Sequence, residues 1–169
     1  MDEIDTGRLV LRPVRPFVAR ALLEERVPDG VVLAPGYPSE FSLEVMRMVL
    51  GGNGGYGPFF MVRKLDGAVV GEIGAHLDGT TAKVGYTVVE PSWGRGYATE
   101  ALRALVAHLF ESAGVQRVVG ETLVGHAASR RVMEKAGLHR RGERVGEEGE
   151  LVVYELLAPT GAGPPPAAP

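Results

Sequence analysis

Residues 84–101, VGYTVVEPSWGRGYATEA, contain the pattern that decides the fold. A β-branched run ends at two closely spaced glycines, and a helix-forming run begins near Ala98. Gly94 and Gly96 allow the backbone to approach a ligand closely, and the first N–H groups of the helix are free and lie at its positive dipole end. The segment therefore predicts an anion site, and its natural ligand is a phosphate or a pyrophosphate.

Two common phosphate-binding loops are excluded by the residues that follow the glycines. A P-loop requires Lys followed by Ser or Thr after its last glycine, whereas Gly96 is followed by Tyr97 and Ala98. The dinucleotide-binding fingerprint requires Gly or Ala three residues after its second glycine, where this chain has Thr99. The flanking sequence also lacks the βαβ repeat of that fingerprint.

The segment resembles the pyrophosphate loop of the GCN5-related N-acetyltransferases (GNAT), and within them the branch that acetylates the N-termini of ribosomal proteins. The loop of that family reads Gln/Arg-x-x-Gly-x-Gly/Ala, and its amides hold the diphosphate of acetyl-CoA. Gly96 and Ala98 match the last two defined positions. Trp93 stands where Gln or Arg is usual, a replacement that is common in the ribosomal-protein branch.

Two further segments extend the resemblance to roughly residues 6–157. TGRLVLRPVRP, residues 6–16, resembles the first strand of that branch, and RVVGETLVGHAASRRVMEKAGL, residues 117–138, resembles the fifth strand and fourth helix of the family. The resemblance implies a mixed α/β GNAT fold, with a central, mostly antiparallel sheet of six to seven strands. That sheet would splay between its fourth and fifth strands and be flanked by about four helices.

Composition indicates one domain and narrows the function classes. The chain has 169 residues, of which 45% are hydrophobic, enough for one substantial core. We expect a single domain over residues 1–157 and a disordered tail, APTGAGPPPAAP, over residues 158–169. With no cysteine there is no thiolate metal site, and we expect no metal. A net charge of −3 and no basic stripe argue against nucleic acid.

The termini and hydropathy suggest where the protein acts. The first residues are polar and acidic, and no apolar run approaches the ~18 residues that span a bilayer. We therefore predict a cytoplasmic protein without a membrane partner, acting as a monomer or a homodimer.

Periodicity predicts most of the secondary structure. Residues 17–26 and a segment beginning at a Ser42 cap are expected to be helical, with an irregular connection over residues 28–38. An antiparallel meander is expected over residues 58–63, 69–77 and 82–89, followed by a strongly amphipathic helix at 98–110. A strand at 115–123, a helix at 129–135 and a strand at 150–157 follow, with an optional strand at 138–143.

The resemblance also implies which residues bind acetyl-CoA. In the family, backbone groups at the end of the fourth strand contact the pantetheine, and the corresponding positions here are residues 87–89. His126 occupies the position of a family Asn and either donates to the pantetheine or caps the next helix. The expected cofactor-binding residues are Val88, Val89, Gly94, Arg95, Gly96, Tyr97, Ala98, Thr99 and His126.

Two glutamates compete for the role of general base. Glu121 lies five residues before His126, at the spacing where family members often have a catalytic Glu, although a solvated strand residue would fit the same pattern. Glu72 interrupts the apolar run VVGEIGAHL, and His76 follows it on the same face of the strand. Partial burial raises the pKa of a carboxyl group and makes it an effective base near neutrality.

The leaving-group acid departs from the family pattern. The family usually has a Tyr seven residues after the Asn position, where this chain has Met133, which cannot donate a proton. The ribosomal-protein branch often lacks that Tyr and has been assigned a Ser one turn earlier, a place that Ser129 occupies here. Ser129 could equally satisfy free amides at the start of its helix.

The sequence thus predicts an acetyl-CoA-dependent N-acetyltransferase that acts by direct attack in a ternary complex. The resemblance favours a protein N-terminal amine as the acceptor, with a small amine such as an aminoglycoside or polyamine as the alternative. A domain that binds acetyl-CoA without turnover, and serves in regulation, is the second class. Its support comes from the departures at Met133 and His126.

Overall fold

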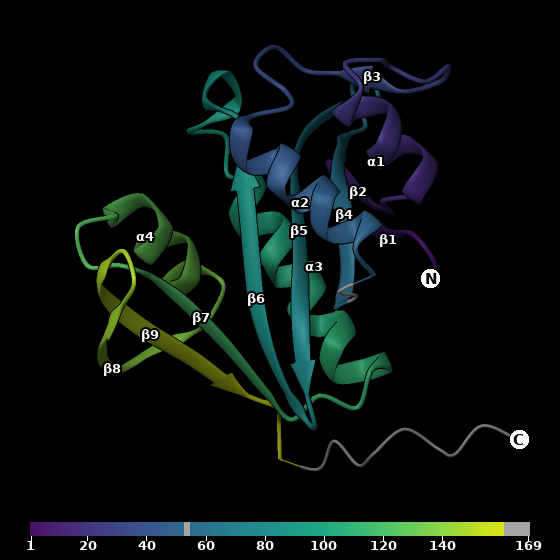
Figure 1. Cartoon of the computed structure of the whole chain (residues 1–169). Coiled ribbons are helices and arrows are strands. Elements are labelled where there is room, and N and C mark those ends of the chain that lie inside the picture. Colours follow the sequence, from purple (N-terminus) through teal and green to yellow (C-terminus); the bar gives the residue numbers. More distant parts are fainter. Residues whose placement is uncertain (53–54, 161–169) are drawn as a thin grey trace, which may run out of the picture.

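The computed structural model describes residues 1–52 and 55–160, and it consists of one open sheet with helices on both faces (Figure 1). The last strand ends at Leu157, and the Ala158 N–H still donates to the Gln116 carbonyl at 2.8 Å. The rest of the predicted tail, residues 161–169, lies outside the described residues.

The elements follow one another in an order that ends with two hairpin-paired strands. The helices are α1 (Pro16–Leu23), α2 (Glu40–Leu50), α3 (Tyr97–Ser112) and α4 (Ala127–Lys135), with a short 3-10 turn, η1 (Glu90–Ser92). The strands are β1 (Ile4–Asp5), β2 (Leu9–Pro13), β3 (Val32–Leu33), β4 (Tyr56–Arg63), β5 (Ala68–Asp78), β6 (Thr81–Val88), β7 (Arg117–Leu123), β8 (His139–Gly146) and β9 (Gly149–Leu157). None of the helices among these described residues combines the length and apolarity needed to cross a membrane.

The sheet is mixed and it opens in the middle. Its order is β1-β2-β4-β5-β6-β7-β9-β8, with β3 paired to β5. The β3–β5 and β6–β7 pairs are parallel and the others are antiparallel. Strands β6 and β7 pair only as far as Val84 and Gly120, although both continue beyond these residues. They then diverge, as Figure 1 shows, so the predicted splay lies between β6 and β7.

The predicted count of six to seven strands is too low, since the described residues form nine. Two of the additional strands, β1 and β3, have two residues each, too few to show any periodicity in the sequence. The optional strand near residue 138 is present as β8 and pairs with β9.

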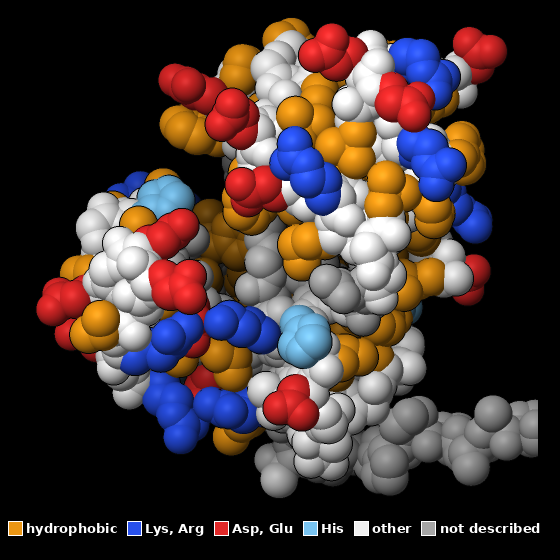
Figure 2. Space-filling model, in the orientation of Figure 1, with side chains coloured by type: hydrophobic (Ala, Val, Ile, Leu, Met, Phe, Trp, Pro, Cys, Tyr) orange, Lys and Arg blue, Asp and Glu red, His pale blue; other side chains and the backbone are white. Residues whose placement is uncertain are grey.

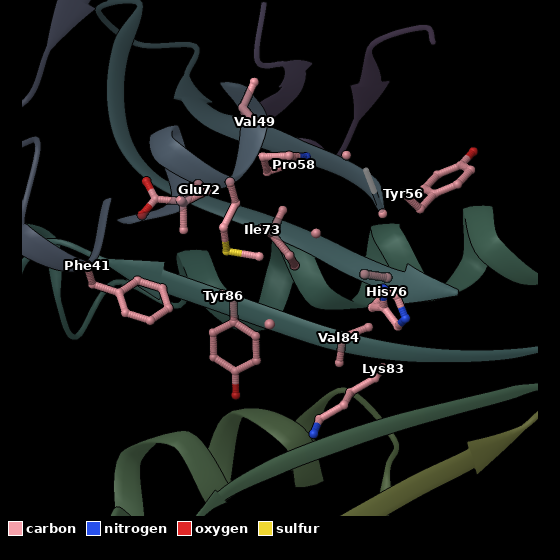
Figure 3. A pocket seen from close by; sticks show the side chains of 17 residues that line it. Phe41, Val49, Tyr56, Pro58, Glu72, Ile73, His76, Lys83, Val84 and Tyr86 are labelled. Atoms are coloured by element: carbon pink, nitrogen blue, oxygen red, sulfur yellow. The ribbon is translucent and has the colours of Figure 1, made fainter. Parts of the chain in front are cut away.

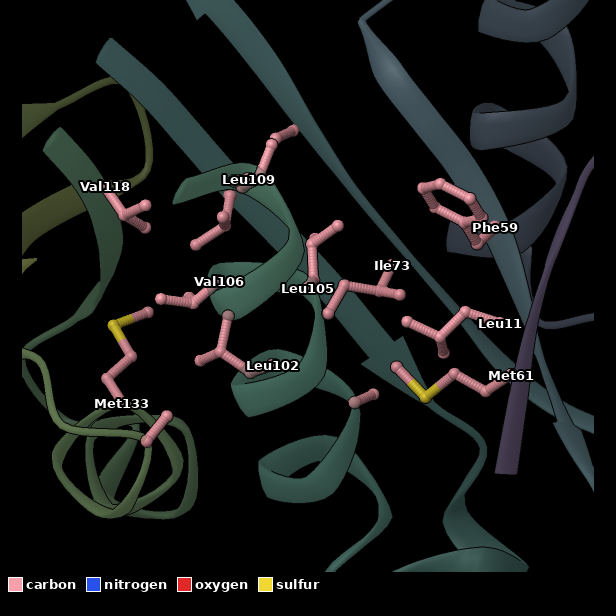
Figure 4. Packing of buried hydrophobic residues seen from close by; sticks show 14 of the residues in the cluster. Leu11, Phe59, Met61, Ile73, Leu102, Leu105, Val106, Leu109, Val118 and Met133 are labelled. Carbon is pink, nitrogen blue, oxygen red and sulfur yellow. The ribbon is translucent and has the colours of Figure 1, made fainter. Parts of the chain in front are cut away.

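Two apolar layers hold the helices against the sheet. The larger layer lies between the sheet and helices α3 and α4, and the smaller one between the sheet and helices α1 and α2. The predicted apolar stripe of α3 is confirmed, because its Leu102, Leu105 and Leu109 are completely buried (Figure 4). Met133 of α4 packs into the same layer beside Gly120, where a β-carbon would lie 2.9 Å from the methionine sulfur.

The N-terminus of α2 differs from the prediction. Ser39, not Ser42, is the cap, and its hydroxyl accepts from the Ser42 N–H at 3.1 Å. Ser42 lies inside the first turn, fully buried, with its hydroxyl 2.9 Å from that of Ser39. Helix α1 ends at Leu23 rather than at residue 26, since Glu25 adopts a left-handed φ of 57°.

Candidate active site

Beyond Val84, the divergence of β6 and β7 leaves the edge of β6 that faces β7 without a strand partner among the described residues. Hydrogen-bonding direction alternates along an antiparallel strand, and the Val89 N–H donates to the Val70 carbonyl on β5. By that alternation the N–H and C=O groups of Tyr86 and Val88 face the open side. The Trp93 indole donates to the Val88 carbonyl at 2.5 Å. We call the opening between residues 85–88 of β6 and residues 121–123 of β7 the wedge. The wedge therefore offers polar backbone groups to a ligand that lies between the two strands.

The glycine loop adopts the conformation expected for an anion site. Gly94 and Gly96 have φ angles of 74° and 78°, values that side chains other than glycine rarely adopt. Gly96 is the N-cap of α3, and no side chain in the described part of the chain caps the helix. The first amides of α3 therefore lack a partner within the helix and lie at its positive end.

A cavity of about 490 Å³ joins this loop to the wedge. Among the residues that line it, the structure brings together nine predicted site residues from three separate segments: Val88, Gly94, Arg95, Gly96, Tyr97, Ala98, Thr99, His126 and Ser129. Val89 is the one predicted cofactor-binding residue that is not among the described residues lining this cavity. It is buried against α1 and α2, and its N–H is bonded to Val70, because it lies one residue out of phase with the open edge.

Sequence reasoning missed two cations and an aromatic residue in this cavity. Arg131 and Lys135 line it from α4, and Tyr86 lines it from β6. The two cations are four residues apart, so they lie on one face of a helix, together with Ala128 and Val132. This four-residue spacing in the sequence could have predicted the two cations as candidate anion-binding residues, because cations on one helix face beside a glycine loop fit a diphosphate.

A second cavity, of about 290 Å³, lies on the other face of the sheet beneath α2. Figure 3 shows Phe41 and Val49 of α2, Ile73 of β5 and Val84 of β6 around it. Its lining is mostly apolar, and its ionisable residues other than tyrosine are Glu72, His76 and Lys83. Figure 2 shows a hollow between the part of the molecule with α4 and β7–β9 and the part with α1 and α2, and both hydrophobic side chains and white groups line it. Among the described residues, Tyr86 alone lines both this cavity and the glycine-loop cavity.

Glu72 is an unusual carboxylate because it is 1% exposed and unpaired. Within the described part of the chain neither of its oxygens has a hydrogen-bond partner, and the buried Tyr37 hydroxyl is likewise unsatisfied. Burial raises the pKa of Glu72 to about 7. The nearby Ser42 and Tyr37 hydroxyls oppose this rise in pKa, although neither makes a hydrogen bond of good geometry. Burial, followed by the charge of Glu72, raises the pKa of Tyr37.

Glu121 is in the opposite electrostatic situation. Its carboxylate accepts from Arg144 Nε at 2.8 Å and from Lys83 Nζ at 2.8 Å, while its side chain is only 14% exposed. The hydrogen bond from Arg144 is the main reason that its pKa falls to about 2, and Lys83 adds to the effect. Glu121 lines neither of the two cavities at the wedge, but a neighbouring groove that also holds Arg141.

The remaining predicted residues take distinct places. His126 is the N-cap residue of α4, and its Nδ1 lies 3.4 Å from the Thr122 hydroxyl. The Ser129 hydroxyl lies 3.0 Å from the Tyr86 hydroxyl across the wedge. His76 lines the apolar cavity, as does Glu72 on the same strand.

Comparisons with known proteins agree with this architecture. Residues 8–139 match the family model described as acetyltransferase (GNAT) domain. The chain is 44% identical over 54 residues to the FsC-acetyl coenzyme A-N(2)-transacetylase of Aspergillus fumigatus, a match covering 32% of this chain. That match covers 23% of the Aspergillus protein. The chain is also 27% identical to an uncharacterised N-acetyltransferase of Bacillus subtilis, over 54% of this chain and 56% of the Bacillus protein. The chain thus spans at most about half of these curated relatives.

Solved structures share the whole fold. A GNAT-family acetyltransferase from Bacillus anthracis superposes with a TM-score of 0.71 at 21% identity, over 93% of this chain and 99% of that one. RimJ of Mycobacterium smegmatis, solved with CoA-disulfide, gives a TM-score of 0.70 at 22% identity, over 93% and 88%. At these identities the likeness establishes the fold.

The sheet, its wedge and the glycine loop define a mixed α/β domain with two cavities, one beside the glycine loop and one beneath α2. The chain belongs to the GNAT acetyltransferase family, as the family model over residues 8–139 shows. The predicted fold class and family resemblance are confirmed.

Proposed function

We propose that the chain is an acetyl-CoA-dependent N-acetyltransferase that transfers the acetyl group directly to a primary amine. One observation carries the proposal: two cavities of different chemistry lie on opposite faces of the sheet and meet at Tyr86 in the wedge. One cavity is bordered by the glycine loop and by the cations Arg95, Arg131 and Lys135 and fits a diphosphate, and the other is mostly apolar and has Glu72 among its lining residues. A ternary complex would bring the two substrates together at the wedge.

The glycine-loop cavity would hold acetyl-CoA. The amides that follow Gly96 and the cations Arg131 and Lys135 complement its diphosphate. The open edge of β6 would hold the pantetheine, and an N–H of this edge at Tyr86 or Val88 would stabilise the oxyanion that forms when the amine attacks.

Glu72 is the general base that we propose for the amine. Glu72 is one of the residues that line the apolar cavity, and its carboxyl oxygens are themselves buried. Its pKa near 7 matches the task of taking a proton from an ammonium group at neutral pH once the bound amine reaches it. Glu121, with its pKa near 2 and its two cationic partners, is a far weaker proton acceptor. We therefore prefer Glu72, the other glutamate that interrupts an apolar strand.

For the acceptor we propose a protein N-terminal amine whose first residue is small or apolar. Glu72 is the one acidic residue among the described residues that line the cavity, whereas a polycation such as an aminoglycoside or polyamine would require several. Lys83 lines the same cavity, and Lys and Arg side chains gather on the surface beside the hollow in Figure 2. This charge pattern favours an acceptor with a single ammonium group.

An acceptor screen tests both parts of the proposal. Thiol release from acetyl-CoA is measured with peptides that begin with Ala, Ser, Val, Asp or Lys, and with an aminoglycoside and a polyamine. We expect kcat/KM to be at least about 10-fold higher for the Ala, Ser and Val peptides than for the Asp and Lys peptides, because burying an unmatched charge costs several kcal/mol.

The other outcomes identify the alternatives. Release only with the polycations would make the chain a small-amine acetyltransferase. Tight binding of acetyl-CoA without release to any amine would contradict the catalytic proposal and favour a regulatory, acetyl-CoA-binding domain.

A further inference from the structure

Tyr86 presents a phenol at the meeting point of the two cavities. It comes from β6, is half-buried, and points across the wedge toward α4. Its hydroxyl donates to the Ser129 carbonyl at 3.2 Å and lies 3.0 Å from the Ser129 hydroxyl. When Tyr86 donates to the carbonyl, the Ser129 hydroxyl is free to donate to the phenol oxygen. The two bonds hold the phenol at a defined place in the wedge.

Met133 of α4 occupies the position at which the family usually has a tyrosine that acts as the acid, and it cannot take that role. Met133 has no proton to give, and it is 2% exposed and packed against Gly120 in the large apolar layer. Replacing it would not bring a polar group into the cavity without disturbing that packing. The phenol of Tyr86 instead reaches α4 at Ser129, one turn before Met133.

Resting on the proposed acetyl transfer, we propose that Tyr86 is the acid that protonates the leaving thiolate of CoA. The amine nitrogen forms a bond to the acetyl carbon, the tetrahedral intermediate breaks its C–S bond, and the sulfur takes the phenol proton. Tyr86 is left as a phenolate and recovers a proton from solvent by way of the Ser129 hydroxyl. The ammonium group gives one proton to Glu72 before the attack, and its nitrogen releases a second to solvent as the amide forms. After Tyr86 has recovered its own proton, the two protons lost by the nitrogen are matched by one on Glu72 and one on the sulfur.

The surroundings of Tyr86 suit both halves of this exchange. Burial is the main cause that raises the pKa of Tyr86, so the phenol keeps its proton at neutral pH. The Ser129 hydroxyl opposes this rise in pKa because it donates to and stabilises the phenolate. Of the described residues that line the same cavity, Arg95, Arg131 and Lys135 are cations and none has a carboxylate. Ser129 is accordingly a positioning residue, and Tyr86 is the residue that touches the sulfur.

The test compares Tyr86→Phe with the wild type on two acetyl donors. With acetyl-CoA we expect kcat to fall by about 10², the lower end of the usual value of acid catalysis. With the selenium analogue of acetyl-CoA, whose selenolate leaves without a proton, we expect a loss of less than about 10-fold. The alkaline limb of the wild-type pH–rate profile should disappear in Tyr86→Phe.

Two other variants separate this role from a structural one. Tyr56→Phe removes the same hydroxyl from the other tyrosine of the apolar cavity, where it bonds to His108 at 2.6 Å, and should leave the donor dependence unchanged. Ser129→Ala should lower kcat less than Tyr86→Phe does and to the same extent on both donors, and it should move the alkaline limb to higher pH, because the phenolate loses its donor.

The assignment would be overturned if Tyr86→Phe lost the same factor in kcat with both acetyl donors, or lost none with either. It would also be overturned if Ser129→Ala, and not Tyr86→Phe, lost more kcat with acetyl-CoA than with the selenium analogue. Acetyl-CoA affinity, measured by calorimetry, should stay within a few-fold of the wild type in all three variants, and a large fall in Tyr86→Phe would assign Tyr86 to binding instead. Wild-type protein that binds acetyl-CoA but releases no thiol with any amine would instead defeat the proposed function itself.

Discussion

Replacing Glu72 with glutamine should lower kcat by roughly 10²–10⁴ while leaving the affinity for acetyl-CoA close to that of the wild type. The loss in kcat follows because the amide cannot take a proton from the ammonium group. The affinity is preserved because Glu72 lines the apolar cavity beneath α2 and not the glycine-loop cavity. Single-turnover kinetics and calorimetry measure the two quantities separately.

The same substitution should change how activity depends on pH. The carboxyl group of Glu72 has a pKa of about 7, so the wild-type rate should rise as pH increases through that value. Glu72→Gln should lose this acidic limb. A limb that persists unchanged in the variant would show that another group titrates.

The burial of Glu72 should also make the unfolding free energy depend on pH, and Glu72→Gln should remove that dependence. Below the ordinary pKa of 4.5 the carboxyl group is protonated in both the folded and the unfolded chain, and its contribution to stability is fully present. As pH rises toward about 7 the unfolded chain releases the proton first, and the wild type loses about 3 kcal/mol of unfolding free energy. Glu72→Gln avoids this loss, so its Tm relative to wild type should be higher at pH 8 than at pH 4.

Glu121→Gln provides the matched control. Its pKa is lowered, so its stabilising contribution is present above pH 4.5 and is lost as pH falls toward 2. The variant should therefore be less stable at neutral pH, with kcat changed by less than about 10-fold. If Glu121→Gln has the large loss of kcat and Glu72→Gln is silent, β7 supplies the base and the assignment is reversed.

The contrast between the two glutamates explains what the sequence can predict about the site. Both interrupt apolar strands, and family spacing favours Glu121. Its pKa is set by Lys83 and Arg144, which lie 38 and 23 residues away in the chain. The burial of Glu72 depends on helix α2, which packs over β5. Because these contacts are tertiary, no local pattern distinguishes a paired carboxylate from an unpaired one.

Features set by neighbouring residues were predictable. The amphipathic stripe of α3 and the glycine loop before it depend on positions within a few residues of one another, and both are present as expected. The predicted cap of α2, Ser42, was wrong because Ser39 and Ser42 are three residues apart and both can cap a helix. The two-residue strands β1 and β3 could not be predicted, because they are too short to show a periodicity. The sequence could not show that Tyr86 rather than Thr87 turns its backbone groups toward the wedge. The register of β6 against β5 decides which residues face the open edge.

Replacing Gly96 with valine should weaken acetyl-CoA binding by roughly 10- to 100-fold. Gly96 has a φ of 78°, and a β-branched residue in that conformation costs about 1–2 kcal/mol even where space is open. Here a β-carbon would also lie 3.4 Å from the Arg8 guanidinium. The backbone can relieve this strain by rotating, and the amides that begin α3 would then turn away from the diphosphate. Calorimetric titration with acetyl-CoA gives the affinity directly.

Gly67→Val is the control that separates strain from recognition. Gly67 has a φ of 72° in the hairpin between β4 and β5, a β-carbon there would meet nothing within 4 Å, and the residue does not line the glycine-loop cavity. Both variants should lose comparable unfolding free energy, since the backbone strain is the same, but only Gly96→Val should lose affinity. Equal affinities in Gly96→Val and the wild type would mean that the loop does not hold the diphosphate. In that case Arg131 and Lys135 of α4 would have to provide the anion site from the other side of the cavity.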